Sequence, residues 1–301
     1  LISVSSPRAM RFSCTIADQG SVENVTRYLR TMAAICHHKI GMKIGPDAIA
    51  LHSAETVKNG GHSLTLKFDT SCAFSTYVSN HSPCLLQCLS LDAFLPFSED
   101  VPFIMLEVEI RKLTDIFHAS KGHVRWKLFN KAAGNDTLGV KKPHFLVQMR
   151  ENHVSHHIPV TVVTEKRWEA YERQQQPLGK VIHMPSARSI YKTLQQFKQS
   201  QARFVIFQCD QEGKFSLGAQ LEQAKTVVFF PDCMVDVSAS TEIDPFRTKL
   251  NLRSLNTFFG GLLSAPHCTC TLNVTSERTA EIQVQMYESE LSFVIGSVVN
   301  E

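Results

Sequence analysis

Short stretches in which apolar and polar residues alternate, or in which β-branched and aromatic residues run together, recur along most of the chain. Most are bounded by Gly, Pro, Asn or Asp, which is the pattern of β-strands. The predicted strands are 11–16, 48–52, 63–68, 124–129, 145–149, 158–163, 204–209, 215–221, 226–230, 269–274, 281–287 and 291–299. The chain is therefore predicted to be rich in antiparallel sheet, with hairpin turns at 59–61, 134–136 and 210–214.

A few stretches instead repeat their apolar residues with the period of an α-helix. The clearest follows Pro185, where Ser186 is the predicted N-cap. Its apolar residues share one side, and its basic and amide residues lie opposite. The predicted helices are 21–36, 111–120, 187–201 and 254–263.

The order of these elements is the same in the two halves of the chain. Each half has a strand, a basic helix, several strands, a strand that leads into a short helix, and further strands. Such self-similarity predicts two domains of one architecture. We expect 1–9 to be a disordered leader, 10–163 to be the first domain, 164–179 to be a polar, Gln-rich connector, and 180–301 to be the second domain.

Composition narrows the class of protein. Of the 301 residues, 43% are hydrophobic and 20% are charged, which excludes a disordered or collagen-like chain. No apolar run reaches the ~18 residues expected of a membrane helix, so no membrane association is expected. The nine cysteines are odd in number and scattered, which fits reduced thiols in the cytosol or nucleus better than a disulfide scaffold.

The net charge is only +3, but the acidic residues are unevenly placed. No Asp or Glu occurs in 24–46, 116–135, 173–209 or 245–276, and each of these windows overlaps a predicted helix. An exposed helix usually mixes both signs, because Glu and Lys pairs stabilise it. Two interpretations remain. The bases either solvate ordinary amphipathic helices, or they form a surface that contacts the phosphates of a nucleic acid.

The duplicated order, together with several local segments, resembles the DNA sliding-clamp fold of the proliferating-cell nuclear antigen family. Within that family, the chain resembles the Hus subunits of the nine-one-one checkpoint clamp. The segment that carries most of the resemblance is 156–163, His-His-Ile-Pro-Val-Thr-Val-Val, followed by Trp168. The other similar segments are Met10-Arg11-Phe12, Leu106-Glu107-Val108, 210–217 and 250–255, so that the resemblance runs from Met10 to the C-terminus.

The resemblance implies an α+β fold of two repeated clamp domains, with antiparallel sheets outside and four helices lining the inner face of a ring around duplex DNA. It implies a non-enzymatic, nuclear subunit of a heterotrimer, with the cytoplasm as a second location. The expected partners are two other clamp subunits, a clamp loader, duplex DNA bound without sequence specificity, and checkpoint and repair proteins. The residues expected to face DNA are Arg27, Arg30, Lys39, Lys112, Lys121, Arg188, Lys192, Lys198 and Arg253.

Two strands are expected to pair with neighbouring subunits. Pro159 interrupts a β-rich run and cannot donate a ladder hydrogen bond, so it is expected on an edge strand. The run 225–230 would be an aggregation hazard as an uncovered edge, although it could instead be an interior strand. The candidate interface residues are Ile158, Pro159, Val160, Thr226, Val227, Val228 and Phe229.

Trp168 and Tyr171 are the aromatic residues of the predicted connector. The resemblance implies that partner motifs dock at the connector and at a hydrophobic pocket beneath it. The alternative is that the two rings pin the connector onto a domain. The acidic and Gln-rich composition of this connector departs from the family pattern, so the set of partners is left open.

No motif in the sequence predicts catalysis, a metal or a cofactor. The segment 134–141 lacks the Lys-Ser/Thr order of a phosphate-binding loop and is better explained as a hairpin tip. His81, Cys84 and Cys88, or His267 with Cys268 and Cys270, could supply zinc ligands but lack a fourth partner at suitable spacing. The segment 71–102 is long and irregular, and no role is assigned to it. Two other function classes remain, a two-domain adaptor that binds only proteins and a hydrolase whose site leaves no motif.

Overall fold

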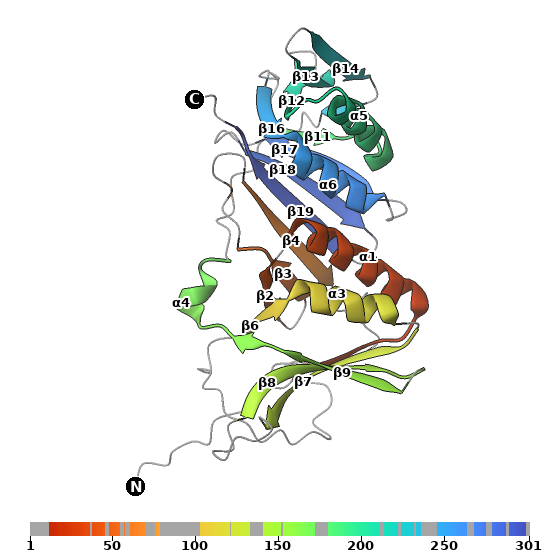
Figure 1. Cartoon of the computed structure of the whole chain (residues 1–301), viewed down its shortest axis with the longest axis vertical. Coiled ribbons are helices and arrows are strands. Elements are labelled where there is room, and N and C mark those ends of the chain that lie inside the picture. Colours follow the sequence, from red (N-terminus) through yellow and green to blue (C-terminus); the bar gives the residue numbers. More distant parts are fainter. Residues whose placement is uncertain are drawn as a thin grey trace. The chain divides into compact units, whose positions relative to one another are not determined.

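A computed structural model of the chain describes most of its residues (Figure 1). The described residues are 12–36, 38–45, 48–54, 57, 61–69, 76–78, 103–120, 122–132, 141–151, 153–171, 180–210, 214–221, 224–231, 233–235, 246–263, 268–274, 279–286 and 289–298. Several predictions therefore lie outside them: the leader 1–9, Lys121, the first zinc candidate (His81, Cys84, Cys88), His267 of the second, and the hairpin tip 134–140 with its turn. The predicted turn 59–61, the turn 210–214 and the segment 71–102 are described only in part.

The described residues form an antiparallel α+β fold, as predicted. Their helices are α1 (Gln19–Ile35), α3 (Ile110–Ala119), α4 (Glu165–Trp168), α5 (Ala187–Gln199) and α6 (Leu252–Leu262). Their strands are β1 (Ser13–Ile16), β2 (Lys39–Ile44), β3 (Ala48–His52), β4 (His62–Asp69), β5 (Thr76–Val78), β6 (Ile104–Glu109), β7 (Val124–Ala132), β8 (Lys141–Met149), β9 (Val154–Pro159), β10 (Thr161–Val162), β11 (Lys180–His183), β12 (Phe204–Cys209), β13 (Phe215–Gln220), β14 (Lys225–Phe230), β15 (Met234–Val235), β16 (Phe246–Asn251), β17 (Thr269–Val274), β18 (Thr279–Met286) and β19 (Ser289–Gly296). None of the described helices is long and apolar enough to cross a membrane.

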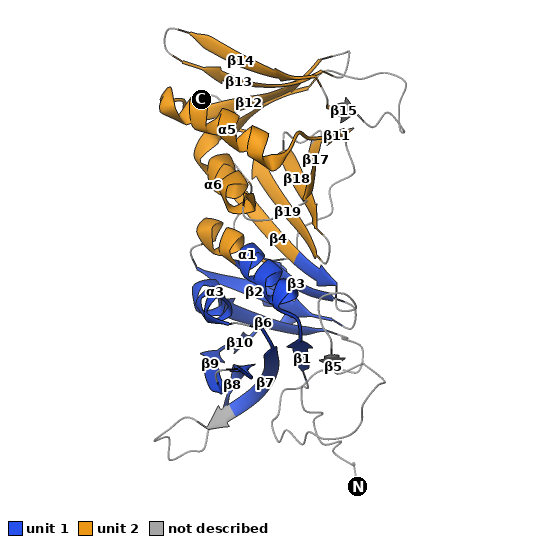
Figure 2. Cartoon of the chain, turned by 90° about the vertical axis from the view of Figure 1, so that its right-hand side faces the viewer, with its two compact units in different colours: residues 1–29, 38–51, 67–172 blue, residues 30–37, 52–66, 173–301 orange. Residues whose placement is uncertain are grey.

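The chain forms two compact units (Figure 2). The first comprises residues 1–29, 38–51 and 67–172, and the second comprises 30–37, 52–66 and 173–301. The change of unit at residues 172 and 173 falls within the predicted connector 164–179. Two short segments from the first half of the sequence, 30–37 and 52–66, belong to the second unit.

In the first unit, strands run in the orders β5-β1-β7-β8-β9 and β10-β6-β2-β3. The helices α1 and α3 lie side by side (Figure 1), and the Thr26 hydroxyl of α1 lies 3.3 Å from the Phe117 carbonyl oxygen of α3. The helix α3 packs on β7 through an edge-to-face contact between Phe117 and Trp126, whose ring centroids lie 4.7 Å apart. Buried aromatic pairs of this kind contribute about 0.5–1.5 kcal/mol beyond the area that they bury.

In the second unit, strands run in the orders β14-β13-β12-β16 and β19-β18-β17-β11-β15. The helices α5 and α6 lie side by side on one face of these strands (Figures 1 and 2). The helix α6 packs on β19, where the rings of Phe258 and Phe293 stack with centroids 4.4 Å apart. The side of α5 predicted to be apolar is buried; it consists of Ala187, Ile190, Leu194 and Phe197.

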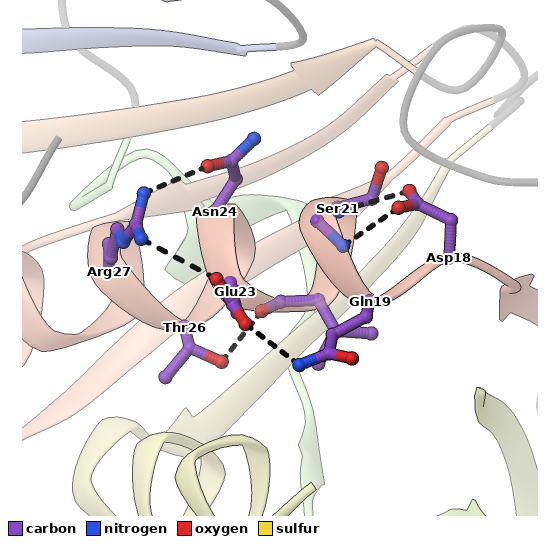
Figure 3. Close-up of polar contacts among 9 residues, drawn as sticks. Asp18, Gln19, Ser21, Glu23, Asn24, Thr26 and Arg27 are labelled. Carbon is purple, nitrogen blue, oxygen red and sulfur yellow. Dashed lines mark hydrogen bonds and ion pairs between the residues drawn. The ribbon is translucent and has the colours of Figure 1, made fainter. Parts of the chain in front are cut away.

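Capping residues explain where two helices begin. The Ser186 hydroxyl accepts a hydrogen bond from the Ser189 backbone N–H at 3.2 Å, so the predicted N-cap of α5 is confirmed. The helix α1 begins at Gln19, before the predicted start, because the Asp18 carboxylate accepts backbone N–H bonds from Gly20 and Ser21 at 2.7 and 3.0 Å (Figure 3). Hydrogen bonding from Ser21 also lowers the pKa of Asp18.

Several elements were not predicted, among them β2, α4 and the short strands β5 and β15. The strand β2 contains Gly41, which weakens the strand pattern in the sequence. The four-residue helix α4 lies in the predicted connector, where the polar composition indicated no element. These two elements meet in the structure, because the rings of Trp168 and Tyr171 lie over Gly41.

Candidate functional site

The exposed side of α5 carries bases and no acids. Arg188, Lys192 and Lys198 are all exposed. No acidic residue occurs along α5 or along α6, whose single base, Arg253, is also exposed. A single-sign helical surface of this kind attracts anions, because no neighbouring carboxylate competes for the cations.

The bases of α1 have a different environment. The observed helix includes Glu23, which precedes the acid-free window 24–46. The Arg27 guanidinium lies 3.5 Å from the Glu23 carboxylate and 3.4 Å from the Asn24 side-chain oxygen (Figure 3). Arg30 is exposed farther along the same helix. The acid-free window 24–46 therefore does not cover the whole of α1, and Arg27 is partly neutralised.

The bases near α3 are also close to acids. The Lys112 ammonium forms an ion pair of 2.6 Å with the Glu109 carboxylate, which immediately precedes the helix. Lys39, at the start of β2, is exposed and lies opposite Glu109 in the strand register. Asp115 lies within α3. The helix α3 thus carries both signs of charge, whereas α5 and α6 carry no acidic residue.

The structure brings two of the predicted DNA-facing residues to one cavity. Lys198 at the end of α5 and Arg253 at the start of α6 both line it, and Arg203, between α5 and β12, lines it with them. Arg203 was not among the predicted site residues. Arg203 lies in the acid-free window 173–209, which could have indicated a role in the site. It was not selected because it follows the end of the predicted helix 187–201.

Within the described residues, the two predicted interface strands are edge strands. The strand β9 is at the edge of the sheet β5-β1-β7-β8-β9, and β14 is at the edge of the sheet β14-β13-β12-β16. On β14, the Phe229 side chain is 65% exposed, Thr226 is exposed, and Val227 and Val228 are half-buried. On the β9 side, Pro159 is exposed, but Ile158 and Val160 are buried within the first unit. The side chains of Ile158 and Val160 are therefore not open to a neighbour, and the Val160 backbone N–H already donates to the Pro143 carbonyl oxygen at 3.1 Å.

Trp168 and Tyr171 are packed onto the first unit. They form a buried cluster with Met105 and Val163, in which the Trp168 side chain is 1% exposed and that of Tyr171 is 8% exposed. A Cβ atom on Gly41 would lie 2.7 Å from the Tyr171 ring and 2.9 Å from the Trp168 ring. Only a glycine fits beneath these rings without displacing them. This packing fixes the start of the connector on the sheet.

A buried carboxylate holds the same segment. Glu107 on β6 is 4% exposed, and its Oε1 atom accepts hydrogen bonds from the Tyr171 hydroxyl at 3.1 Å and from the Arg167 guanidinium at 2.6 Å. Burial, together with the nearby Glu107 charge, raises the pKa of Tyr171 to about 12. Tyr171 is therefore a neutral donor at ordinary pH. The role of Glu107 was not predicted, because its partners lie some sixty residues later in the sequence.

Two thiols lie together at the start of β17. Hydrogen bonding with Cys270 lowers the pKa of Cys268 to about 7, whereas the pKa of Cys270 is raised, chiefly by the same contact. Within the described parts of the chain, no group of three or more His, Cys, Asp or Glu side chains is placed to hold a metal ion. Because its pKa is the lower of the two, Cys268 has a larger thiolate fraction than Cys270.

Comparison with known proteins gives consistent results. The family model described as Hus1-like protein matches residues 10–298. Among solved structures, the proliferating cellular nuclear antigen of Entamoeba histolytica is similar, with a TM-score of 0.66 and 12% identity over 96% of this chain and 99% of that chain. A comparison with curated proteins finds no match. At this identity the structural likeness shows the fold alone, and it confirms the predicted sliding-clamp architecture.

Proposed function

The chain belongs to the Hus1-like protein family, and we propose that it is a subunit of a heterotrimeric checkpoint clamp that encircles duplex DNA in the response to DNA damage. In this role it is a non-enzymatic platform. Its partners are two other clamp subunits, a clamp loader, duplex DNA, and checkpoint and repair proteins, and it acts in the nucleus. The two clamp domains are 10–163 and 180–301, joined by the connector 164–179.

The observation that carries this proposal is the acid-free, exposed basic surface of α5. Arg188 and Lys192 are spaced by one helical turn and protrude from the same side of a helix whose opposite side is buried. Side chains at this spacing can contact successive phosphates without reading base sequence. Lys39, Lys112 and Arg27 would add less, because Glu109 and Glu23 already lie near them. Arg30, Lys121, Lys198 and Arg253 complete the proposed surface.

Subunit contacts are proposed to form by strand addition at β9 and β14. An edge strand offers unpaired backbone groups to an incoming strand. The exposed Phe229 ring and the Thr226, Val227 and Val228 side chains would contact the neighbour directly. On the other edge, Pro159 would contact the neighbour by its side chain, and Ile158 and Val160 are proposed as buried parts of the same edge.

For the connector, we propose that Trp168 and Tyr171 act as anchors. Burial of both rings against Gly41 supports the alternative in which they pin the connector. Partner proteins would then dock beside these rings. Direct docking onto the rings requires their displacement from the cluster.

A charge-reversal experiment tests the proposed function. The chain is assembled with its two partner subunits, loaded onto primed circular DNA, and compared with the double variant Arg188→Glu and Lys192→Glu. We expect the double variant to fold and assemble normally but to lose most of its retention on DNA, with a salt dependence weaker than that of the parent. Lys166→Glu, an exposed charge reversal on α4, is the matched control. Unchanged retention in the double variant would favour the adaptor that binds only proteins.

A further inference from the structure

A cationic cavity lies in the second unit, where α5 ends and α6 begins. Its volume is about 520 Å³, and Lys198, Arg203 and Arg253 line it. All three side chains are exposed. None of the described residues that line the cavity is acidic. Three cationic residues around one cavity, with no carboxylate among its described lining residues, attract an anion.

The wall of the cavity is partly apolar and is held in place by the backbone. Ala202, Phe204 and Leu252 contribute its apolar part. The Leu252 backbone N–H donates to the Arg203 carbonyl oxygen at 3.1 Å, which ties the segment that bears Arg203 to the start of α6. The Lys249 ammonium lies 4.5 Å from the centroid of the Phe204 ring and fixes that ring further. The cavity therefore combines a cationic rim with an ordered apolar wall.

The first unit supplies an internal comparison. Phe204 pairs with Asn251 in the register of β12 and β16, as Lys39 pairs with Glu109 in the register of β2 and β6. Asn251 and Glu109 are each the residue that precedes the helix. Glu109 carries a carboxylate that pairs with Lys112, whereas the Asn251 side chain is neutral and accepts a hydrogen bond from the Ser254 N–H at 3.2 Å. Of these two helix starts, the one without a carboxylate is thus that of the second unit.

We propose that this cavity binds a phosphorylated peptide segment of a partner protein. The phosphate would contact Lys198, Arg203 and Arg253, because arginine guanidinium groups form paired, charge-assisted hydrogen bonds with phosphate oxygens. A neighbouring apolar side chain of the peptide would pack on Phe204 and Leu252. A duplex backbone matches the cavity less well, since it offers a row of phosphates with no apolar side chain beside them. The inference does not depend on DNA binding by Arg188 and Lys192. It shares Lys198 and Arg253 with the proposed DNA surface, so the test compares peptide binding with duplex DNA binding.

Two pools of short fluorescent peptides test the proposal with the full chain, by fluorescence anisotropy. The pools are identical, with a fixed leucine next to the central residue, except that this central residue is phosphothreonine in one and threonine in the other. We expect the phosphothreonine pool to bind about tenfold more tightly or better, the factor that one charge-assisted contact supplies.

Matched variants locate the site. Asn251→Asp keeps a good N-cap but adds a carboxylate to the cavity, and Arg203→Glu reverses an exposed charge; each should weaken binding by about tenfold or more. Lys166→Glu reverses an exposed charge on α4, outside the cavity, and should leave peptide binding unchanged. Circular dichroism and thermal melting check that all variants fold. Equal binding of the two pools, or no binding of either, overturns the proposal. So does a loss of duplex DNA binding in Asn251→Asp that equals the loss of peptide binding, because the cavity would then hold the nucleic-acid backbone.

Discussion

The Tyr171 hydroxyl donates a hydrogen bond of 3.1 Å to the buried Glu107 carboxylate, and so joins the start of the connector to the strand β6. The same carboxylate oxygen accepts from Arg167 at 2.6 Å. Glu107 is 4% exposed, so it depends on these partners in place of water. Removal of either donor should loosen the connector without altering the basic side of α5.

Tyr171→Phe should lower the free energy of unfolding by about 1–2 kcal/mol, because it removes a buried hydrogen bond to a charged acceptor. Burial and Glu107 raise the folded-state pKa of Tyr171 to about 12, above its unfolded value near 10. The contribution of Tyr171 should thus be complete below pH ~10 and should disappear as pH rises through about 12. Urea unfolding of both proteins across this range measures it. A difference that grows toward pH 12 would contradict this account.

Gly41→Ala should destabilise the protein by about 1–3 kcal/mol and displace the aromatic pair, because the new Cβ atom would lie 2.7 Å from the Tyr171 ring. The emission of Trp168 should shift to the red as the ring becomes exposed. Gly218→Ala is a matched control, since its Cβ atom would meet its nearest neighbours at 3.7 to 3.8 Å. If Gly41→Ala and Gly218→Ala changed the stability equally, the close contact of the Tyr171 and Trp168 rings with Gly41 would not be what requires a glycine there.

Phe229→Glu should abolish or strongly weaken assembly with one neighbouring subunit and leave the stability of the isolated chain within about 0.5 kcal/mol. The reason is that Phe229 is 65% exposed on the edge strand β14. Leu263→Glu, at a side chain that is 39% exposed beyond α6, provides the control. Analytical ultracentrifugation of the mixed subunits distinguishes the two. If Leu263→Glu disrupted assembly while Phe229→Glu did not, β14 would not be the interface.

Cys268 should react with iodoacetamide faster than Cys14 at pH 7, with a rate that increases as pH passes through about 7. Its pKa is lowered to about 7 by Cys270, whereas burial raises the pKa of Cys14. Cys270→Ala should slow the reaction of Cys268, because the hydrogen bond that stabilises the thiolate is lost. Peptide mass spectrometry follows each site separately. Similar rates at Cys268 and Cys14 would show that the thiol pair has no such effect.

Much of the fold could be predicted from local patterns. The strands 48–52, 204–209 and 269–274 have the predicted bounds, and the predicted helix 187–201 begins where predicted, because alternation, helical period and the Ser186 cap are all local signals. The strand β2 was missed because Gly41 lowers its strand propensity. That glycine is required by rings about 130 residues later, a contact that no local pattern records.

The candidate site was predicted less completely. The bases of α5 were identified because they share a helical stripe and an acid-free window. The windows did not indicate the ion pairs of Arg27 and Lys112, because Glu23 lies one residue before the window 24–46, and Lys112 and Glu109 both lie before the window 116–135. The cavity at Arg203 depends on the meeting of α5, β12 and α6, so only the folded structure brings its residues together.

The central claim is that the assembled protein encircles DNA, and topology tests it most directly. The complex is loaded onto nicked circular DNA, washed at high salt to remove proteins held only by charge, and then exposed to a nuclease that cuts the circle once. We predict stable retention on the circle and rapid release from the linear ends. Equal retention on circular and linear DNA, or release from both at high salt, would contradict the claim.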